Sequence, residues 1–192
     1  MGSRVAVLLL ASAVSASAGS LTVEVRDGRG NAVAGAVVYA VPEGKAPPPS
    51  RRAVMDQKNR MFVPHVMAVQ TGTAVSFPNS DNVRHQVYSF SPAKKFQLPL
   101  YAGTPAAPVV FDKPGVVAIG CNIHDQMSAY IVVVDTPHFA VTGNGRAEMR
   151  GLAEGRYDVR VWHEGMRGEP PAQSVRVGGE DAMTVTFRLG DK

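Results

Sequence analysis

The chain has 192 residues, enough for one large domain or two small ones. Its 19 glycines and 14 prolines, with few long segments of helical periodicity, argue against a helical fold. The formal net charge is only +4 and the basic residues are scattered, so we expect no nucleic acid among its partners.

Residues 1–18 have the pattern of an export signal. Arg4 supplies the positive start, residues 5–13 the apolar core, and Ala16–Ser17–Ala18 the small-residue cleavage site. The apolar run is too short to span a bilayer, and no later segment is long and apolar enough to do so. We therefore expect a periplasmic protein, cleaved after Ala18, with no transmembrane segment in the mature chain.

The remainder alternates apolar and polar residues between turns rich in Gly and Pro, as β-strands do. The first two predicted strands, 21–26 and 36–41, are expected to form a hairpin, and the proline-rich segment 42–52 a linker. Further strands are expected at 61–63, 68–70, 74–77, 85–90, 96–101, 109–111, 116–121, 129–135, 147–149, 157–162, 174–177 and 183–189. This spacing, with no helix between the strands, predicts an all-β sandwich fold.

One short stretch carries the chemistry. Cys121, the only cysteine, is followed at three-residue intervals by His124 and Met127. A lone cysteine cannot form an internal disulfide, and a free thiol is a liability in an oxidising compartment, so metal ligation would account for it. Thiolate, imidazole and thioether are the donors of a blue-copper site, which also needs a second histidine. His85 is the candidate.

The spacing Cys121-x2-His124-x2-Met127 resembles the ligand loop of cupredoxins, in the short version found in amicyanin. The segment containing Phe77–Pro78–Asn79, Asp81 and His85 resembles the cupredoxin strand that ends in the first histidine ligand. The resemblance covers about residues 61–135. It implies a cupredoxin Greek-key β-sandwich that binds one copper ion.

The same resemblance implies a role for each ligand. Cys121, His85 and His124 would form the equatorial set, with Met127 as the long axial ligand. Asn79 would hydrogen-bond across the site and steady the Cys121 loop.

The flanks have a family likeness of their own. Residues 21–42 resemble the opening of a carboxypeptidase-regulatory or transthyretin-like β-sandwich, and residues 145–160 are similar to its middle. The whole mature chain is similar to the methylamine-utilization-protein-like family. These likenesses imply a cupredoxin domain at 53–135, inserted into a small split sandwich made of 19–52 and 136–192.

The function implied is electron transfer by a carrier rather than an enzyme. Its partner would be a redox protein such as a cytochrome or dehydrogenase, docking near His124. No catalytic triad, carboxylate pair or phosphate loop indicates a hydrolase or transferase, and His138 and His163 lie outside the cupredoxin segment.

Three alternatives stay open. A cupredoxin needs no histidine at position 65, so His65 is a candidate additional ligand that would create an open, non-blue site for small-molecule binding or catalysis. A copper-delivery protein could use the same ligands. A metal-free adhesion or carbohydrate-binding sandwich would leave Cys121 as an ordinary thiol.

Overall fold

The computed structural model describes residues 18–44, 52–105, 107–179 and 182–190. The predicted export signal lies outside the described residues except for Ala18, as does most of the predicted linker. Within the described ranges all regular secondary structure is β, which confirms the all-β fold class. No helix in that part of the chain is long and apolar enough to cross a membrane.

The strands follow one another closely along the chain. In order, they are β1 (Gly19–Arg26), β2 (Val37–Pro42), β3 (Arg52–Val54), β4 (Asp56–Lys58), β5 (Met61–Val63), β6 (Val66–Gln70), β7 (Thr73–Ser76), β8 (His85–Ser89), β9 (Phe96–Tyr101), β10 (Val109–Phe111), β11 (Gly115–Gly120), β12 (Ser128–Val134), β13 (Phe139–Val141), β14 (Arg146–Leu152), β15 (Gly155–Trp162), β16 (Gln173–Val177) and β17 (Ala182–Arg188).

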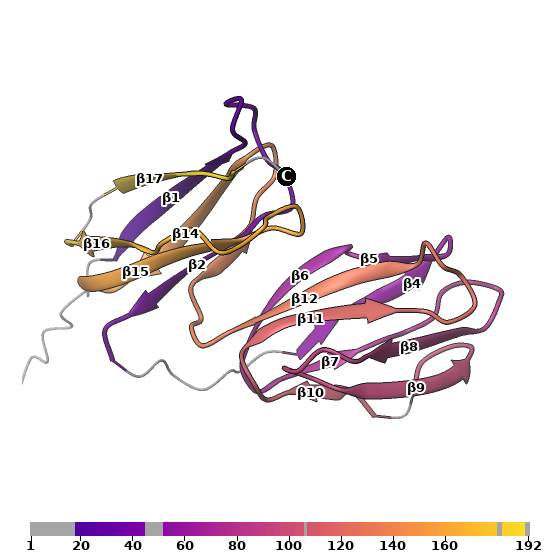
Figure 1. Cartoon of the computed structure of the whole chain (residues 1–192). Coiled ribbons are helices and arrows are strands. Elements are labelled where there is room, and N and C mark those ends of the chain that lie inside the picture. The colour runs from indigo at the N-terminus through magenta and orange to yellow at the C-terminus, as the bar shows by residue number, and fades with distance from the viewer. Residues whose placement is uncertain (1–17, 45–51, 106, 180–181, 191–192) are drawn as a thin grey trace, which may run out of the picture.

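Strands β3 to β12 form one lobe, which we call the insert lobe (Figure 1). A five-stranded sheet, β6-β12-β11-β8-β9, and a three-stranded sheet, β10-β7-β3, enclose a shared core. Phe62, Phe77 and Phe111 fill much of that core and are at most 2% exposed. Cys121 and Met127 belong to the same apolar cluster, so the predicted ligand loop closes one end of this core.

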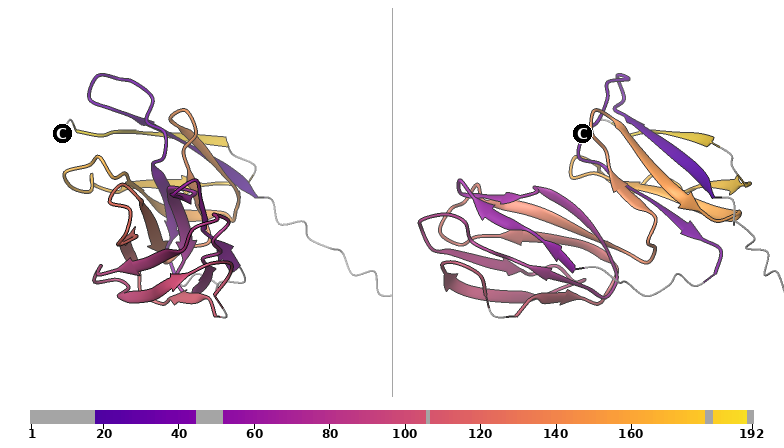
Figure 2. Two further views of the ribbon diagram at one scale, coloured as in Figure 1. Left: turned by 90° about the vertical axis from the view of Figure 1, so that its right-hand side faces the viewer. Right: turned by 180° about the vertical axis from the view of Figure 1, so that it is seen from behind.

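Strands β1, β2 and β13 to β17 form the second lobe, which we call the outer lobe (Figure 2). Its sheets are β14-β1-β17 and β13-β2-β15-β16, so each sheet combines strands from both ends of the chain. Its apolar cluster draws on residues 21–40 and 147–189. This separation of cores favours the predicted split sandwich with an insertion, although the boundaries at 53 and 135 stay a prediction.

The predicted hairpin between 21–26 and 36–41 is wrong. β1 lies between β14 and β17, whereas β2 lies between β13 and β15 in the other sheet of the outer lobe. Proximity in sequence favours a hairpin, but β1 and β2 each pair instead with strands from the carboxyl-terminal part of the chain. The turn after β1 therefore carries the chain from one sheet to the other.

The lobes meet along one side of β12. Alternate residues Ile131 and Val133 point into the core of the insert lobe. A separate buried cluster at the junction comprises Val37, Val132 and Val134, packed against Tyr39, Val66, Ala68, Phe139 and Trp162. Because β12 is buried on both faces and begins directly after Met127, the outer lobe contacts the strand that leaves the ligand loop.

Candidate metal centre

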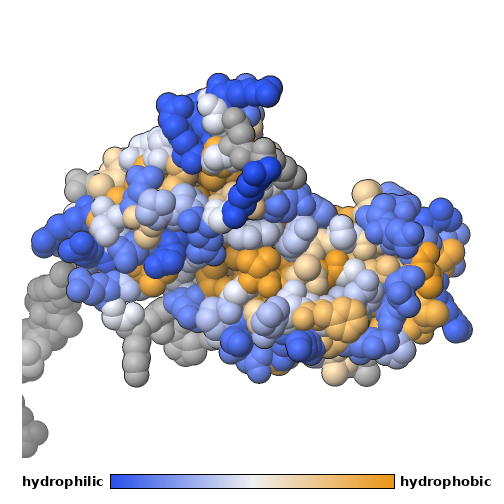
Figure 3. Space-filling model, viewed as in Figure 1, coloured by the Kyte–Doolittle hydropathy of each residue, from blue (hydrophilic) through white to orange (hydrophobic). Residues whose placement is uncertain are grey.

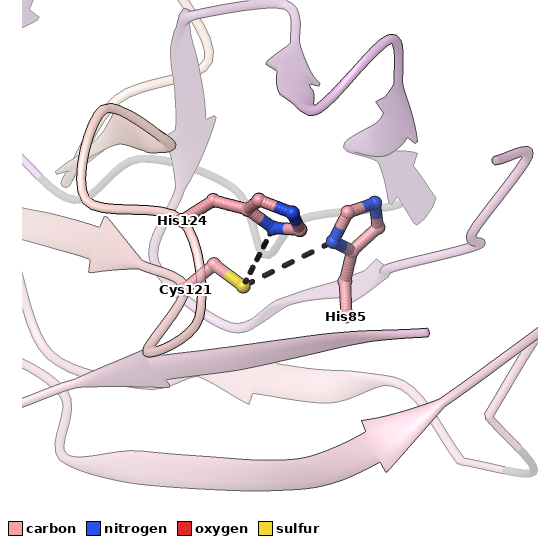
Figure 4. A group of neighbouring side chains, drawn as sticks. All are labelled: His85, Cys121 and His124. Atoms are coloured by element: carbon pink, nitrogen blue, oxygen red, sulfur yellow. Dashed lines mark hydrogen bonds between the residues drawn. The ribbon is translucent and has the colours of Figure 1, made fainter. Parts of the chain in front are cut away.

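Three side chains from two segments converge at one end of the insert lobe (Figure 4). His85 is the first residue of β8, Cys121 follows β11, and His124 lies in the loop before β12. The Cys121 Sγ atom is 4.0 Å from Nδ1 of His85 and 4.0 Å from Nδ1 of His124. One ligand atom from each residue lies within 4.8 Å of the others, and no second group of this kind occurs in the described ranges.

The loop that carries Cys121 and His124 is closed by its own backbone. β11 and β12 pair up to Gly120 opposite Ser128, which brings the two ends of the loop together. Cys121 N–H donates to the Met127 carbonyl at 3.2 Å, and Met127 N–H donates to the His124 carbonyl at 2.9 Å. Cys121 and Met127 are buried, which fixes both sulfur atoms in the protein interior.

His85 is held in one orientation by Asp81. The His85 ring is fully buried, and its Nε2 lies 2.8 Å from Asp81 Oδ2. Because the carboxylate accepts, Nε2 carries the hydrogen in a neutral ring, and the lone pair remains on Nδ1, which faces Cys121. Hydrogen bonds of this kind orient metal-binding histidines and raise their basicity.

Asp81 is itself anchored by the turn between β4 and β5. Asn59 and Arg60, both at positive φ, donate their backbone N–H groups to its carboxylate at 2.6 and 2.8 Å. Burial alone would raise the pKa of Asp81, but the hydrogen bonds from Arg60, His85 and Asn59 lower the pKa below its usual value. The site therefore keeps a charged carboxylate behind His85.

Asn79 steadies the His85 segment. Its amide donates to the carbonyls of Val83 and Tyr101, both at 2.9 Å, and its Oδ1 accepts from Asp81 N–H. These bonds run to its own loop and to β9 rather than to the Cys121 loop, where the predicted hydrogen bond would lie.

Sequence reasoning missed a buried polar pair behind this segment. Gln57, which is fully buried, donates to the Pro78 carbonyl and to the Tyr101 hydroxyl, which in turn donates to the Phe77 carbonyl at 2.6 Å. Burial raises the pKa of Tyr101 to about 12. The pair fixes the end of the chain segment that leads to His85, and no local pattern in the sequence reveals it.

The other histidines lie outside the group. His65 Nδ1 is 3.0 Å from the Ser128 carbonyl, and its Nε2 is 3.2 Å from Glu164. His163 Nδ1 accepts from Gly165 N–H, and the His138 ring packs edge-on against Tyr157. The structure thus brings together His85, Cys121 and His124, and engages both ring nitrogens of His65 elsewhere.

The three donors fit a single first-row metal ion. Typical bonds of about 2.3 Å to sulfur and about 2.0 Å to nitrogen allow two such ligand atoms to lie at most about 4.3 Å apart, which the 4.0 Å separations satisfy. Structural zinc sites take four Cys or His ligands. A single thiolate with two imidazoles falls short of that set and instead matches the Cys and His donors that copper sites use.

No protein-family model matches the chain, and no curated protein sequence matches it. Solved structures of similar shape include a purple cupredoxin from Nitrosopumilus maritimus, at 21% identity and TM-score 0.38, covering 44% of this chain and 100% of that one. A reduced amicyanin variant has 19% identity and TM-score 0.39 over 50% of this chain and 99% of its own.

A copper-containing nitrite reductase from Thermus scotoductus SA-01 has 24% identity and TM-score 0.41 over 50% of this chain, which spans only 25% of the reductase.

Proposed function

We propose that this protein binds one copper ion at a type 1 site and serves as an exported electron carrier. The observation that carries the proposal is the convergence of one buried thiol and two imidazole Nδ1 atoms, each 4.0 Å from the sulfur. A copper ion held there would supply one-electron redox chemistry.

Each ligand would have a distinct part. Cys121 would bind as a thiolate, and His85 and His124 would bind through Nδ1. Met127, which is 1% exposed and belongs to the same apolar cluster as Cys121, would be the fourth ligand. This assignment of Met127 is part of the proposal, supported by its place in the closed loop.

The rigidity of the site favours electron transfer over copper delivery. Asp81 fixes the His85 ring, and backbone hydrogen bonds close the loop around Cys121 and Met127. Ligands held in this way change position little between oxidation states, which a carrier needs. Delivery requires ligands that release the ion readily, and burial of Cys121 and His85 works against that.

The proposed docking surface surrounds His124, the one partly exposed histidine of the group. Ile123, in the same loop, is 50% exposed, and Val83, in the His85 segment, is 36% exposed. Figure 3 shows apolar side chains at the right-hand end of the molecule, where Figure 1 places the turn between β11 and β12. An apolar patch beside the exposed ligand suits brief contact with a redox protein, such as a cytochrome or dehydrogenase.

One observation favours an open copper site as a second candidate. A groove of about 550 Å³ runs beside the loop and is lined in part by Tyr88, Phe90, Cys121 and Met127. A small anion could approach the sulfur ligands through it. The contacts of both His65 ring nitrogens with Ser128 and Glu164 argue against His65 as an additional ligand of such a site.

The test is the visible absorption and electron paramagnetic resonance spectrum after Cu(II) addition to the protein and to its Cys121→Ser variant. An intense thiolate-to-copper band with narrow hyperfine splitting, absent from the variant, is expected. Added azide should leave this spectrum unchanged; a shift would favour the open site. If neither protein shows a band, the copper proposal is wrong.

A further inference from the structure

His65 joins the two lobes. It lies between β5 and β6 of the insert lobe, and its ring is hydrogen-bonded on both sides. Nδ1 is 3.0 Å from the Ser128 carbonyl at the start of β12, and Nε2 is 3.2 Å from the Glu164 carboxylate, which follows β15 of the outer lobe. The side chains of His65 and Glu164 are 48% and 38% exposed.

The two partners define the protonation state that this arrangement needs. A carbonyl and a carboxylate only accept hydrogen bonds, so each ring nitrogen must carry a hydrogen to make both bonds. Only the imidazolium form of His65 does so, and the neutral ring keeps one bond at most. The titratable groups that contact the ring from the elements packed on it are Glu164 and Tyr130.

Aromatic ring contacts also join the two lobes at His65. The Tyr130 ring meets His65 edge-on at 5.8 Å between centroids and packs against Trp162 of the outer lobe at 5.2 Å. Tyr130 N–H also donates to the His65 carbonyl at 2.9 Å. His65 is thus fixed to β12 by its backbone and ring, while Trp162 and Glu164 approach from the outer lobe.

This contact lies next to the proposed ligand loop. Ser128, which accepts from His65, directly follows Met127, and Met127 is hydrogen-bonded through its backbone to both Cys121 and His124. A continuous series of contacts therefore runs from Glu164 through His65 and Ser128 to the end of the loop.

We propose that His65 is a positioning residue through which the outer lobe holds the carboxyl-terminal end of the ligand loop, and that this hold requires protonated His65. The functional consequence rests on the proposed copper site, because it concerns the geometry of that site. Exposed ion pairs add little to stability, so the effect is on loop geometry rather than on unfolding.

The first test needs no copper. Nitrogen NMR of the metal-free protein at pH 5 should show both His65 ring nitrogens protonated. In Glu164→Gln, the Nε2 hydrogen should exchange with solvent at least about tenfold faster, because a neutral amide holds it less firmly. Glu154→Gln, an exposed change elsewhere in the outer lobe, is the matched control and should resemble the wild type. A singly protonated ring, or unchanged exchange in Glu164→Gln, overturns the proposal.

The second test uses the copper-loaded protein. The reduction potential of the wild type should change between pH 8 and pH 5, and Glu164→Gln and His65→Phe should each lose more than half of that change. His65→Phe keeps a ring against Tyr130 and removes both hydrogen bonds. Identical pH profiles in all variants overturn the proposal, whereas loss of the copper band from the wild type overturns the proposed function and leaves the NMR result to decide on His65.

Discussion

The two ring nitrogens of His85 have different surroundings, and that difference determines which one is available to a metal. Nε2 is bonded to Asp81, whose carboxylate is held by two backbone N–H groups from the turn after β4. Nδ1 faces the Cys121 sulfur. The turn at residues 59–60 supplies no metal ligand, yet through Asp81 it determines the orientation of the His85 ring.

We expect Asp81→Asn to weaken copper binding by about 10- to 100-fold, the usual effect of losing a hydrogen-bonding partner behind a metal ligand. The amide keeps an acceptor oxygen but loses the charge that favours the Nε2–H form and raises the basicity of Nδ1. Competition against a chelator of known affinity measures the loss. Asp112→Asn, which removes an exposed ion pair with Lys94, serves as the control, and equal affinities in the two variants would contradict the role of Asp81.

His138 gives a prediction about pH. Burial lowers the pKa of this half-buried ring, so the folded protein binds its proton less readily than the unfolded chain does. Its contribution to stability is present above the ordinary histidine pKa of about 6.5 and is lost as the pH falls through the lower value of the folded state. The thermal midpoint of the wild type should therefore fall more between pH 7.5 and pH 5 than that of His138→Gln. Parallel curves would refute this.

The ligands could be predicted from sequence because their signal is local. Cys121, His124 and Met127 share one loop, and the lone cysteine marks it. No local sequence pattern reveals contacts between distant segments. Gln57 and Tyr101 are 44 residues apart in sequence, and His65 and Glu164 are 99 residues apart. Only the folded chain reveals which polar residues support the site.

At the scale of elements, alternation of apolar residues predicted most strands but not their partners. β3, β4 and β13 were missed, whereas β5 and β10, also of three residues, were predicted, because so short a run is too few residues for periodicity to decide. The hairpin error arose because pairing depends on strands from the other end of the chain, such as β17 beside β1. Periodicity reports which face of a strand is buried and says nothing of its neighbour.

The turn before β14 offers a prediction at this scale. Gly145 has φ +73°, and an added Cβ would lie 2.7 Å from Ala32 Cβ and 2.9 Å from Ala32 Cα. Gly145→Ala should therefore lower the free energy of unfolding by about 1–3 kcal/mol, through backbone strain and displacement of the turn after β1.

Gly143 supplies the matched control for that change. A Cβ at Gly143 meets nothing within 4 Å, so Gly143→Ala should alter stability by no more than about 0.5 kcal/mol. Urea unfolding of both variants measures the difference. Equal urea midpoints for the two variants would show that the backbone near residues 32 and 145 shifts to accept the added Cβ without loss of stability.

At the scale of the molecule, the junction determines whether the lobes act as one unit. β12 contributes Ile131 and Val133 to the core of the insert lobe and Val132 and Val134 to the junction cluster. A strand buried on both faces cannot leave either lobe without disturbing the other. We therefore expect the wild type to unfold in a single calorimetric transition.

Val132→Ser tests this coupling. The change removes apolar surface from a site that is 3% exposed and buries a hydroxyl there, at a cost of about 2–4 kcal/mol. Val132 points away from the core around Cys121, so the loss of stability should be confined to the junction between the lobes. Calorimetry should then resolve two transitions, and the copper band should persist at room temperature. Val110→Ser, at a 45% exposed position on β10, should leave one transition. Two transitions in the wild type, or one undiminished transition in Val132→Ser, would mean that the lobes are joined only by their connecting segments.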